Sequence, residues 1–244
     1  MENKAEVLEK TALKKQVLQN KRVIADKSIG LKSTPDPDMY KETEPWSYSG
    51  KRMVDLFFAS LGLMVFAILF PIIATGIKLS SPGPVIFRQL RTGLHGRLFY
   101  CFKFRTMEMV QKVSTNGKPV ITEKEDGRIF EFGRYLRKIY LDELPQIINI
   151  LQGDMSLVGP RPYPVEECAY WNHEFDDHFY RYTVLPGITG YAQIKGYRGG
   201  THNKDHMRKR LELDLIYTRN NNLILDIKII FVTAIHVLKS FVKR

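Results

Sequence analysis

An apolar segment without a single charged residue limits how this chain can fold. Residues 56–77 read LFFASLGLMVFAILFPIIATGI. Wound as an α-helix at about 1.5 Å per residue, the segment would be about 33 Å long, close to the ~30 Å thickness of a bilayer's hydrocarbon core. A helix that is apolar on every side is unusual as the core of a soluble domain in a chain of 244 residues. The segment therefore predicts insertion into a membrane.

Pro71 and the flanking charges bear on how this segment enters the membrane. Inside a helix, Pro71 removes one backbone hydrogen bond and collides with the preceding turn. Lys51 and Arg52 precede the segment and Lys78 follows it, whereas a spanning helix has its Lys/Arg excess on the cytoplasmic flank. We therefore expect a re-entrant helix–break–helix over residues 51–79, with both flanks on one face. A straight single pass that tolerates the proline stays open.

The composition as a whole is that of a basic, globular protein. A mean hydropathy of −0.23 excludes a polytopic membrane protein. Hydrophobic residues make up 44% and charged residues 26%, which excludes a wholly disordered chain. Lys and Arg number 37 against 26 Asp and Glu, so the formal net charge is +11. This balance predicts anionic partners, which are nucleic acid, phosphorylated substrates or acidic lipid head groups.

The two cysteines, Cys101 and Cys168, lie far apart and form no CxxC pair. Their number and spacing exclude a disulfide-stapled secreted scaffold and a cysteine-rich zinc site, and favour a reducing, cytosolic environment for the folded part. We expect no signal peptide, because residues 1–30 contain no apolar core.

The chain divides into three parts. Residues 1–50 form a tail or linker, in which 5–23 are a weak amphipathic helix and 33–38 a linker rich in Pro and Asp. The tail is either flexible or carries a partner-binding helix. Residues 51–79 form the membrane helix, and residues 80–244 form a globular domain.

The patterning of the globular domain predicts an α-rich α+β fold. Residues 85–87 and 98–104 read as a β-hairpin, 108–127 as a polar loop and 186–190 as a turn. Helices are expected over 129–138, from about 144 to before 153, and over 164–182, 205–220 and 223–242. The last of these is apolar-rich and packs as core, lies in a membrane interface or forms an oligomer contact.

Two adjacent carboxylates, Asp142 and Glu143, stand out among the candidate catalytic residues. Pro145 belongs in the first turn of a helix, so both carboxylates fall at or just before a helix N-terminus. A carboxylate there is expected to stay ionised, and Asp142 as a simple helix cap stays an alternative.

The surrounding arginines indicate what the two acids do. Arg137 precedes the pair, and Arg161 lies in a rigid Pro-Arg-Pro segment that can direct its guanidinium at a phosphate. This combination suits phosphoryl transfer, in which one carboxylate attacks phosphorus and its partner handles a proton. Oxygen ligands point to Mg²⁺ rather than zinc, and the P-loop motif is absent from the sequence.

Two other functions fit the sequence less well. A non-enzymatic, basic membrane-surface anchor would be weakened by acids inside its basic patch. The sequence contains no recognised RNA-binding motif, so no nucleic-acid partner is expected. A glycosidase ranks last, because adjacent acids at one helix start are poorly placed to flank a sugar ring from both sides at ~5–9 Å.

A set of motifs in order along residues 51–239 resembles a known family. They are KR (51–52) with Asp55, SPGP (81–84), FRQ (87–89), KFRTM (103–107), LDELPQ (141–146), GDMSLVGPRP (153–162) and PGITG (186–190). On these motifs the chain resembles the bacterial sugar transferases, the monotopic polyprenyl-phosphate phosphoglycosyl transferases. One departure is DGRIF at 126–130, where the family often has Asp-Pro-Arg-Ile-Thr.

The resemblance implies a reaction and a location. The reaction is transfer of a sugar 1-phosphate from a nucleotide sugar, usually a UDP-sugar, to undecaprenyl phosphate, with release of UMP. It is the first membrane step in making a polysaccharide or glycoconjugate. The location is the bacterial inner (cytoplasmic) membrane, with a re-entrant helix broken at Pro71, a catalytic domain on the cytoplasmic face, amphipathic interfacial helices and anionic lipid around them. A homo-oligomer is possible.

The resemblance also implies roles for single residues. Asp142 would be the nucleophile that forms a covalent phosphosugar intermediate, and Glu143 its partner in proton handling. Both would hold Mg²⁺. The substrate- and phosphate-binding residues would be Arg137, Arg161, Lys103 and Arg105.

Overall fold

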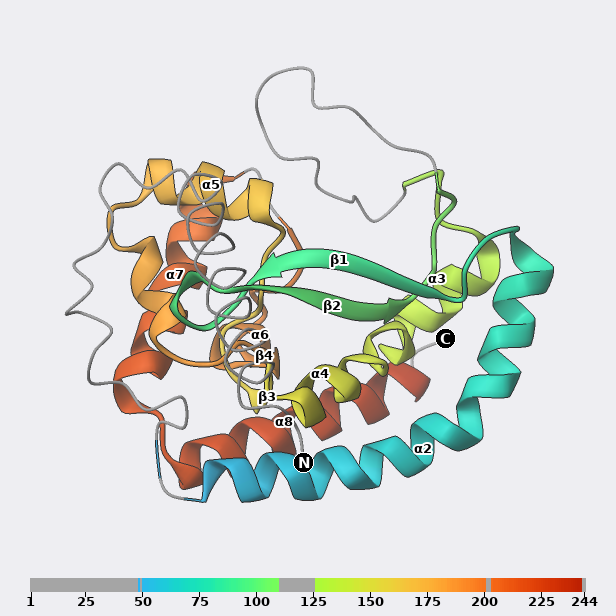
Figure 1. Cartoon of the computed structure of the whole chain (residues 1–244). Coiled ribbons are helices and arrows are strands. Elements are labelled where there is room, and N and C mark those ends of the chain that lie inside the picture. The colour runs from blue at the N-terminus through green and yellow to red at the C-terminus, as the bar shows by residue number, and fades with distance from the viewer. Residues whose placement is uncertain (1–47, 49, 110–125, 201–202, 243–244) are drawn as a thin grey trace, which may run out of the picture.

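The computed structural model describes residues 48, 50–109, 126–200 and 203–242 (Figure 1). The tail helix and linker expected over 5–23 and 33–38, and nearly all of the loop expected over 108–127, lie outside the described residues. The division into 1–50, 51–79 and 80–244 stays a prediction.

The described part is α-rich with two small sheets, which confirms the expected α+β class. Its helices are α2 (Lys51–Ser80), α3 (Glu131–Lys138), α4 (Gln146–Gln152), α5 (Val165–Glu174), α6 (Tyr191–Ile194), α7 (Lys204–Asn220) and α8 (Leu223–Val242). Its strands are β1 (Ile86–Thr92), β2 (Leu98–Phe104), β3 (Ser156–Val158) and β4 (Gly187–Thr189). Short 3₁₀ turns are η2 (Leu94–Gly96), η3 (Leu141–Glu143) and η4 (His178–Thr183).

The two sheets differ in how well the sequence predicts them. The expected hairpin is present, with β1 antiparallel to β2 and Ile86 opposite Phe104. The second sheet pairs β3 with β4 in parallel, where only a turn over 186–190 was expected. Gly187 permits this pairing, because a Cβ there would lie 2.1 Å from the backbone nitrogen of Gly159. The second half of 164–182, expected as helix, is mostly η4 rather than a continuation of α5.

The apolar segment forms one continuous helix, α2, where a helix–break–helix was expected. Pro71 lies inside it, and α2 turns upward towards its C-terminal end in Figure 1. A proline removes one hydrogen bond from a helix and bends it without ending it when the neighbouring turns are supported. α2 is long and apolar enough to cross a membrane.

One face of α2 packs on the globular domain at both ends. Ala59 is buried near the N-terminal end, and Ile73 and Ile77 are buried near the C-terminal end. Two glycines allow close approach, since a Cβ at Gly62 would meet Ile147 at 2.6 Å and one at Gly76 would meet the Phe132 ring at 2.5 Å. The opposite face exposes large apolar side chains, among them Met53, Phe57, Leu61, Met64, Val65, Ile68, Ile72 and Leu79.

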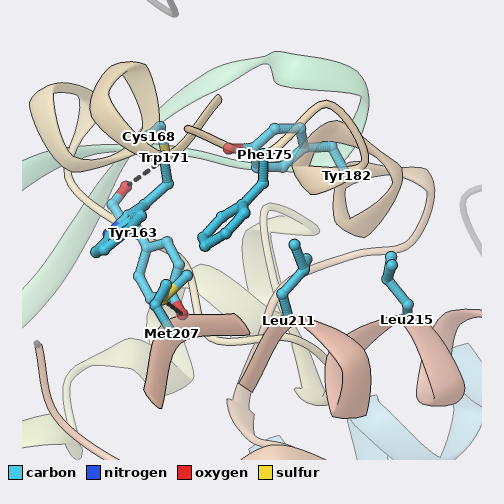
Figure 2. Close-up of a cluster of buried hydrophobic side chains, with 8 residues drawn as sticks. All are labelled: Tyr163, Cys168, Trp171, Phe175, Tyr182, Met207, Leu211 and Leu215. Carbon is cyan, nitrogen blue, oxygen red and sulfur yellow. Dashed lines mark hydrogen bonds between the residues drawn. The ribbon is translucent and has the colours of Figure 1, made fainter. Parts of the chain in front are cut away.

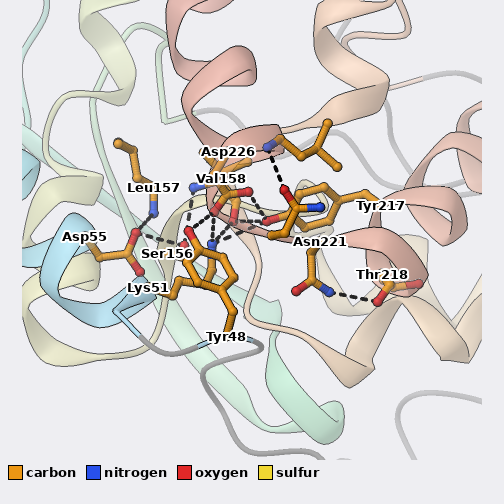
Figure 3. A network of polar contacts seen from close by, with 12 residues as sticks. Tyr48, Lys51, Asp55, Ser156, Leu157, Val158, Tyr217, Thr218, Asn221 and Asp226 are labelled. Atoms are coloured by element: carbon orange, nitrogen blue, oxygen red, sulfur yellow. Dashed lines mark hydrogen bonds and ion pairs between the residues drawn. The ribbon is translucent and has the colours of Figure 1, made fainter.

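A buried polar network fixes the N-terminal end of α2 (Figure 3). The Lys51 ammonium lies 2.5 Å from the Asp226 carboxylate of α8, and each side chain is only 2% exposed. The Tyr217 hydroxyl donates to Asp226 over 2.8 Å. Asp55 accepts hydrogen bonds from the Ser156 hydroxyl and the Leu157 amide, both 2.9 Å long. The network therefore joins α2 to α7, α8 and strand β3.

A second region, built on α5, η4 and α7, is held by apolar packing. Figure 2 shows side chains from the α5 region meeting those of α7. The cluster comprises Tyr163, Cys168, Trp171, Phe175, Tyr182, Met207, Leu211 and Leu215. Both cysteines of the chain are free and buried, in agreement with the expected absence of a disulfide scaffold.

Helix α8 has two unlike faces. Asp226 and Ile229 are buried on the side that packs on the small parallel sheet. The other side exposes Ile224, Ile227, Phe231, Leu238 and Phe241. α8 therefore packs as core on one face, as one sequence interpretation has it, and leaves large apolar side chains exposed on the other.

Candidate active site

The two acids lie in η3, a single 3₁₀ turn between α3 and α4. Tyr140, just before the turn, has φ 61°, a left-handed conformation that costs an L-residue about 1–2 kcal/mol. This conformation ends the helical run of α3 and starts a new turn. Pro145 then lies at the N-cap of α4, one position before the first turn in which it was expected. Neither helix start is capped by a side chain, so the interpretation of Asp142 as a helix cap is wrong.

Glu143 is held by two cations. Its Oε1 atom accepts from the Lys103 ammonium over 2.6 Å and from Arg161 Nη2 over 2.5 Å, while its Oε2 atom accepts from Arg161 Nη1 over 3.1 Å. Burial favours the neutral acid, but Arg161 and Lys103 outweigh it and hold the pKa of Glu143 well below its usual value. Glu143 is therefore a fixed anion.

Asp142 is buried but unbonded. Among the residues that the structure describes, none donates a hydrogen bond to its carboxylate. Burial and the neighbouring Glu143 charge raise the pKa of Asp142 to about 6, although three nearby cations oppose the shift. Desolvation therefore outweighs the helix end, and the Asp142 carboxyl is ionised only above about pH 6, a higher pH than an ordinary aspartate requires. Adjacent carboxylates whose pKa values shift in opposite directions are suited to different roles.

Arg137 lies in the last turn of α3, close enough to Asp142 for their charges to interact. Its Nε donates to the Thr106 hydroxyl over 2.8 Å. Within the described ranges its terminal nitrogens have no protein hydrogen-bond partner. A guanidinium fixed at Nε and open at its outer edge suits a phosphate.

The backbone of the Pro160–Pro162 segment is held at two successive carbonyls, those of Arg161 and Pro162. Arg181 donates to the Arg161 carbonyl over 2.8 Å, and Arg91 donates to the Pro162 carbonyl over 2.5 Å. The rigidity expected from the two prolines is thus reinforced by two buried arginines. Sequence analysis did not predict these roles, and no local pattern around Arg91 or Arg181 indicates them.

Arg105 does not reach the two acids. Its guanidinium donates to the Pro84 carbonyl over 2.6 Å, and to the Ser81 hydroxyl and carbonyl over 2.8 and 2.6 Å. It therefore supports the turn that connects α2 to β1. Lys103, two residues earlier, is the member of this pair that lies at Glu143.

Asn149 is a further supporting residue that sequence analysis missed. Its amide accepts from the Phe102 backbone N–H over 3.0 Å and donates to the Tyr100 carbonyl over 2.7 Å. These bonds join α4 to β2, the strand that carries Lys103. No signal in the local sequence separates this asparagine from a surface residue.

The donor set at the two acids consists of oxygens. In residues 48, 50–109, 126–200 and 203–242, no group of three or more His, Cys, Asp and Glu side chains is placed to hold a metal ion. The open carboxylate of Asp142 offers hard oxygen donors, whereas both oxygens of Glu143 accept from Lys103 or Arg161. Hard oxygen donors suit Mg²⁺, which keeps several waters and binds through one or two carboxylates together with substrate phosphates.

Residues 46–240 match the sequence profile of the family described as bacterial sugar transferase. The chain belongs to the bacterial sugar transferase family. This confirms the resemblance found from its motifs, and it places η3, the Pro160–Pro162 segment and α8 within one family domain.

Three similar proteins have names that describe an activity or a process. A UDP-glucose:undecaprenyl-phosphate glucose-1-phosphate transferase of Xanthomonas campestris pv. campestris is 46% identical over 188 residues, 77% of this chain and 38% of that protein. A UDP-N-acetylgalactosamine-undecaprenyl-phosphate N-acetylgalactosaminephosphotransferase of Aeromonas hydrophila is 38% identical, over 80% of this chain and 45% of that protein. An exopolysaccharide production protein of Rhizobium leguminosarum bv. phaseoli is 37% identical, over 76% and 93%. The chain spans about two fifths of the length of the first two.

Proposed function

We propose that this transferase moves a sugar 1-phosphate from a UDP-sugar to undecaprenyl phosphate and releases UMP. The observation that carries the proposal is the asymmetric pair in η3, a buried and unbonded Asp142 beside a Glu143 fixed by Lys103 and Arg161. The names of similar transferases support the choice of a UDP-sugar as donor and undecaprenyl phosphate as acceptor, and UDP-glucose is the first donor to test.

The reaction has two displacements at one phosphorus atom. A carboxylate oxygen of Asp142 attacks the phosphorus that bears the sugar, the bond from that phosphorus to the bridging oxygen breaks, and UMP leaves. An oxygen of undecaprenyl phosphate then attacks the same phosphorus and displaces Asp142. The products are UMP and a sugar linked to undecaprenyl diphosphate, and the free carboxylate is regenerated.

The cations near Asp142 would stabilise the phosphoryl charge. Arg137 has terminal nitrogens open to the substrate, and Arg161 is aimed by a rigid segment. Preorganised charges of this kind lower the barrier because they do not have to reorient during the reaction.

Glu143 is better suited to positioning than to proton transfer. Its low pKa makes it a weak base, and a phosphate acceptor that is already ionised requires no base in either displacement. We therefore assign to Glu143 the orientation of Lys103 and Arg161 beside Asp142.

Mg²⁺ would be held by the open carboxylate of Asp142 together with the donor's phosphates, where it would offset the diphosphate charge. Glu143 would not be a ligand in this arrangement, because Lys103 and Arg161 already donate to both of its oxygens. Removing divalent cations with EDTA should abolish UMP release, and added Mg²⁺ should restore it. Full activity in EDTA would remove the metal from the proposal.

We also propose that α2 is re-entrant, with both flanks and the catalytic domain at the cytoplasmic face of the inner membrane. Both ends of α2 pack on the same globular domain, and its outer face is apolar along its length. The exposed apolar face of α8 would lie in the same membrane interface, among anionic head groups attracted by the net charge of +11. A helix that crossed the bilayer would have to carry one of its packed ends away from the domain.

The experiment is UMP release by the full chain in nanodiscs that contain undecaprenyl phosphate. UDP-glucose, UDP-galactose and UDP-N-acetylgalactosamine would be compared. Asp142→Asn should abolish UMP release. Lys228→Gln, a substitution at an exposed position of α8, should leave UMP release unchanged. If no donor yields UMP while the protein still binds anionic bilayers, the alternative of a non-enzymatic membrane anchor replaces this proposal.

A further inference from the structure

A basic groove lies between Tyr140, the end of α6 with the segment that follows it, and the C-terminal half of α8. Its volume is about 650 Å³. The lining residues are Tyr140, Gln193, Ile194, Lys195, Gly196, Arg198, His236, Lys239 and Ser240. None of these lining residues is acidic, and three are Lys or Arg, so the groove selects for an anion.

The Arg198 guanidinium is held in place within this groove. Its Nε donates to the Gln193 carbonyl over 2.9 Å, and its Nη2 lies 3.2 Å from His236 Nδ1. The guanidinium stacks over the Tyr140 ring, 5.1 Å from the ring centroid. A cation fixed by a carbonyl and an aromatic ring loses little conformational freedom when it binds a phosphate.

Tyr140 connects the groove to the reacting carboxylate. It lines the groove and immediately precedes η3, which carries Asp142. An anion bound against Arg198 would therefore lie beside the turn where the phosphosugar is proposed to form.

The other border of the groove is apolar. Lys239 and Ser240 line the groove, whereas Leu238 and Phe241 of the same helix face outward and are 65% and 54% exposed. One helix thus presents the Lys239 ammonium to the groove and an apolar edge next to it. This arrangement fits an amphipathic ligand with a phosphate head and a hydrocarbon tail.

We propose that the basic groove binds the phosphate of the polyprenyl acceptor and presents it to the phosphosugar on Asp142. The proposal rests on the function proposed above. Arg198 and Lys239 would hold the phosphate head, and the exposed side of α8 would guide the tail into the bilayer.

The two displacements allow the groove to be tested separately from the chemistry. Donor alone should give one burst of UMP as Asp142 becomes loaded, and acceptor should then sustain turnover. Lys239→Gln and Arg198→Gln should keep the donor-only burst and raise the KM for undecaprenyl phosphate about tenfold, as loss of one charge-assisted hydrogen bond predicts. Lys239→Arg should restore the KM, and Lys228→Gln, on the same helix but outside the groove, should leave it unchanged.

Binding offers a readout that does not depend on turnover. Farnesyl phosphate would be titrated into the full-length Asp142→Asn chain with and without Lys239→Gln, and UDP-glucose would be titrated in parallel. Weaker binding of farnesyl phosphate alone supports the proposal, even if no UMP is released in the other assay. Weaker binding of UDP-glucose alone overturns it and assigns the groove to the donor, and equal binding of both ligands to both chains also overturns it.

Discussion

At the scale of the residue, Asp142 and Glu143 are neighbours in sequence with opposite surroundings. Glu143 has cations at both of its oxygens, whereas burial and the Glu143 charge raise the pKa of Asp142 to about 6. An attacking carboxylate must be ionised, so UMP release should rise with pH through about 6 and then level. In Glu143→Gln the neighbouring charge is lost, and this acidic limb should move to lower pH. The rate of UMP release from the donor alone, measured between pH 4.5 and 8, gives the acidic limb for the unmodified chain and for Glu143→Gln. If the limb lies at the same pH in both chains, a group other than Asp142 titrates.

The same raised pKa predicts that Asp142 costs stability. The folded pKa of about 6 lies above the unfolded value of 3.8, so the folded state is favoured below pH 3.8 and loses that advantage as pH rises through 6. At pH 8 the ionised carboxylate destabilises the fold by up to about 3 kcal/mol. Asp142→Asn should therefore have a higher Tm than the unmodified chain at pH 8 and a similar Tm near pH 4. Equal Tm values at pH 8 would contradict the buried, unbonded carboxylate.

The residues of the site show what a sequence can and cannot reveal. Asp142, Glu143, Arg137 and Arg161 fall within two short stretches, and their residue types indicate phosphoryl transfer. Arg105 is different, because its partners Ser81 and Pro84 come from a turn more than twenty residues earlier. A residue whose role depends on a distant carbonyl leaves no local pattern.

At the scale of the element, α2 and α8 are joined by a buried ion pair between Lys51 and Asp226. Removing one partner leaves a buried charge without compensation, which typically costs about 3–5 kcal/mol. Asp226→Asn should therefore lower the Tm strongly. The double substitution Lys51→Met with Asp226→Leu should lower the Tm less. Thermal unfolding in detergent measures both, with Lys228→Gln as the matched surface control. A double change that is as unstable as Asp226→Asn would mean that the pair contributes through its hydrogen bonds to Tyr217 and Val158.

Element length explains which parts of the fold were predictable. The hairpin and the helices α7 and α8 are long enough for their periodicity to emerge from the sequence. β3 and β4 have three residues each, and they pair across a long separation in the chain, so no periodic signal exists. The positive φ of Tyr140, which places the acids in their own turn, likewise has no signal in its residue type, because a tyrosine rarely adopts it.

At the scale of the whole molecule, the apolar faces of α2 and α8 flank one side of a basic domain. Figure 1 shows both helices along the lower edge of the view, and Lys51–Asp226 joins them at their N-terminal ends. Substrates of opposite character, a soluble nucleotide sugar and a lipid phosphate, would then meet at η3, above this edge. The sequence predicted the two apolar helices. That both ends of α2 pack on the same globular domain could be learned only from the structure.

The fold predicts that the tail before α2 and the catalytic domain lie on the same side of the membrane. Two variants would be labelled in spheroplasts with a membrane-impermeant maleimide: Ser33→Cys in the tail, and Lys209→Cys at an exposed position of α7. The background should be low, because Cys101 and Cys168 are buried. Both cysteines should react only after permeabilisation.

Pro71→Ala restores a helix hydrogen bond and straightens α2, so its two ends can no longer both reach the domain, and the tail cysteine should become reactive in intact spheroplasts. A tail cysteine that already reacts there in the unmodified helix would mean that α2 spans the bilayer and that its packed ends separate in the membrane.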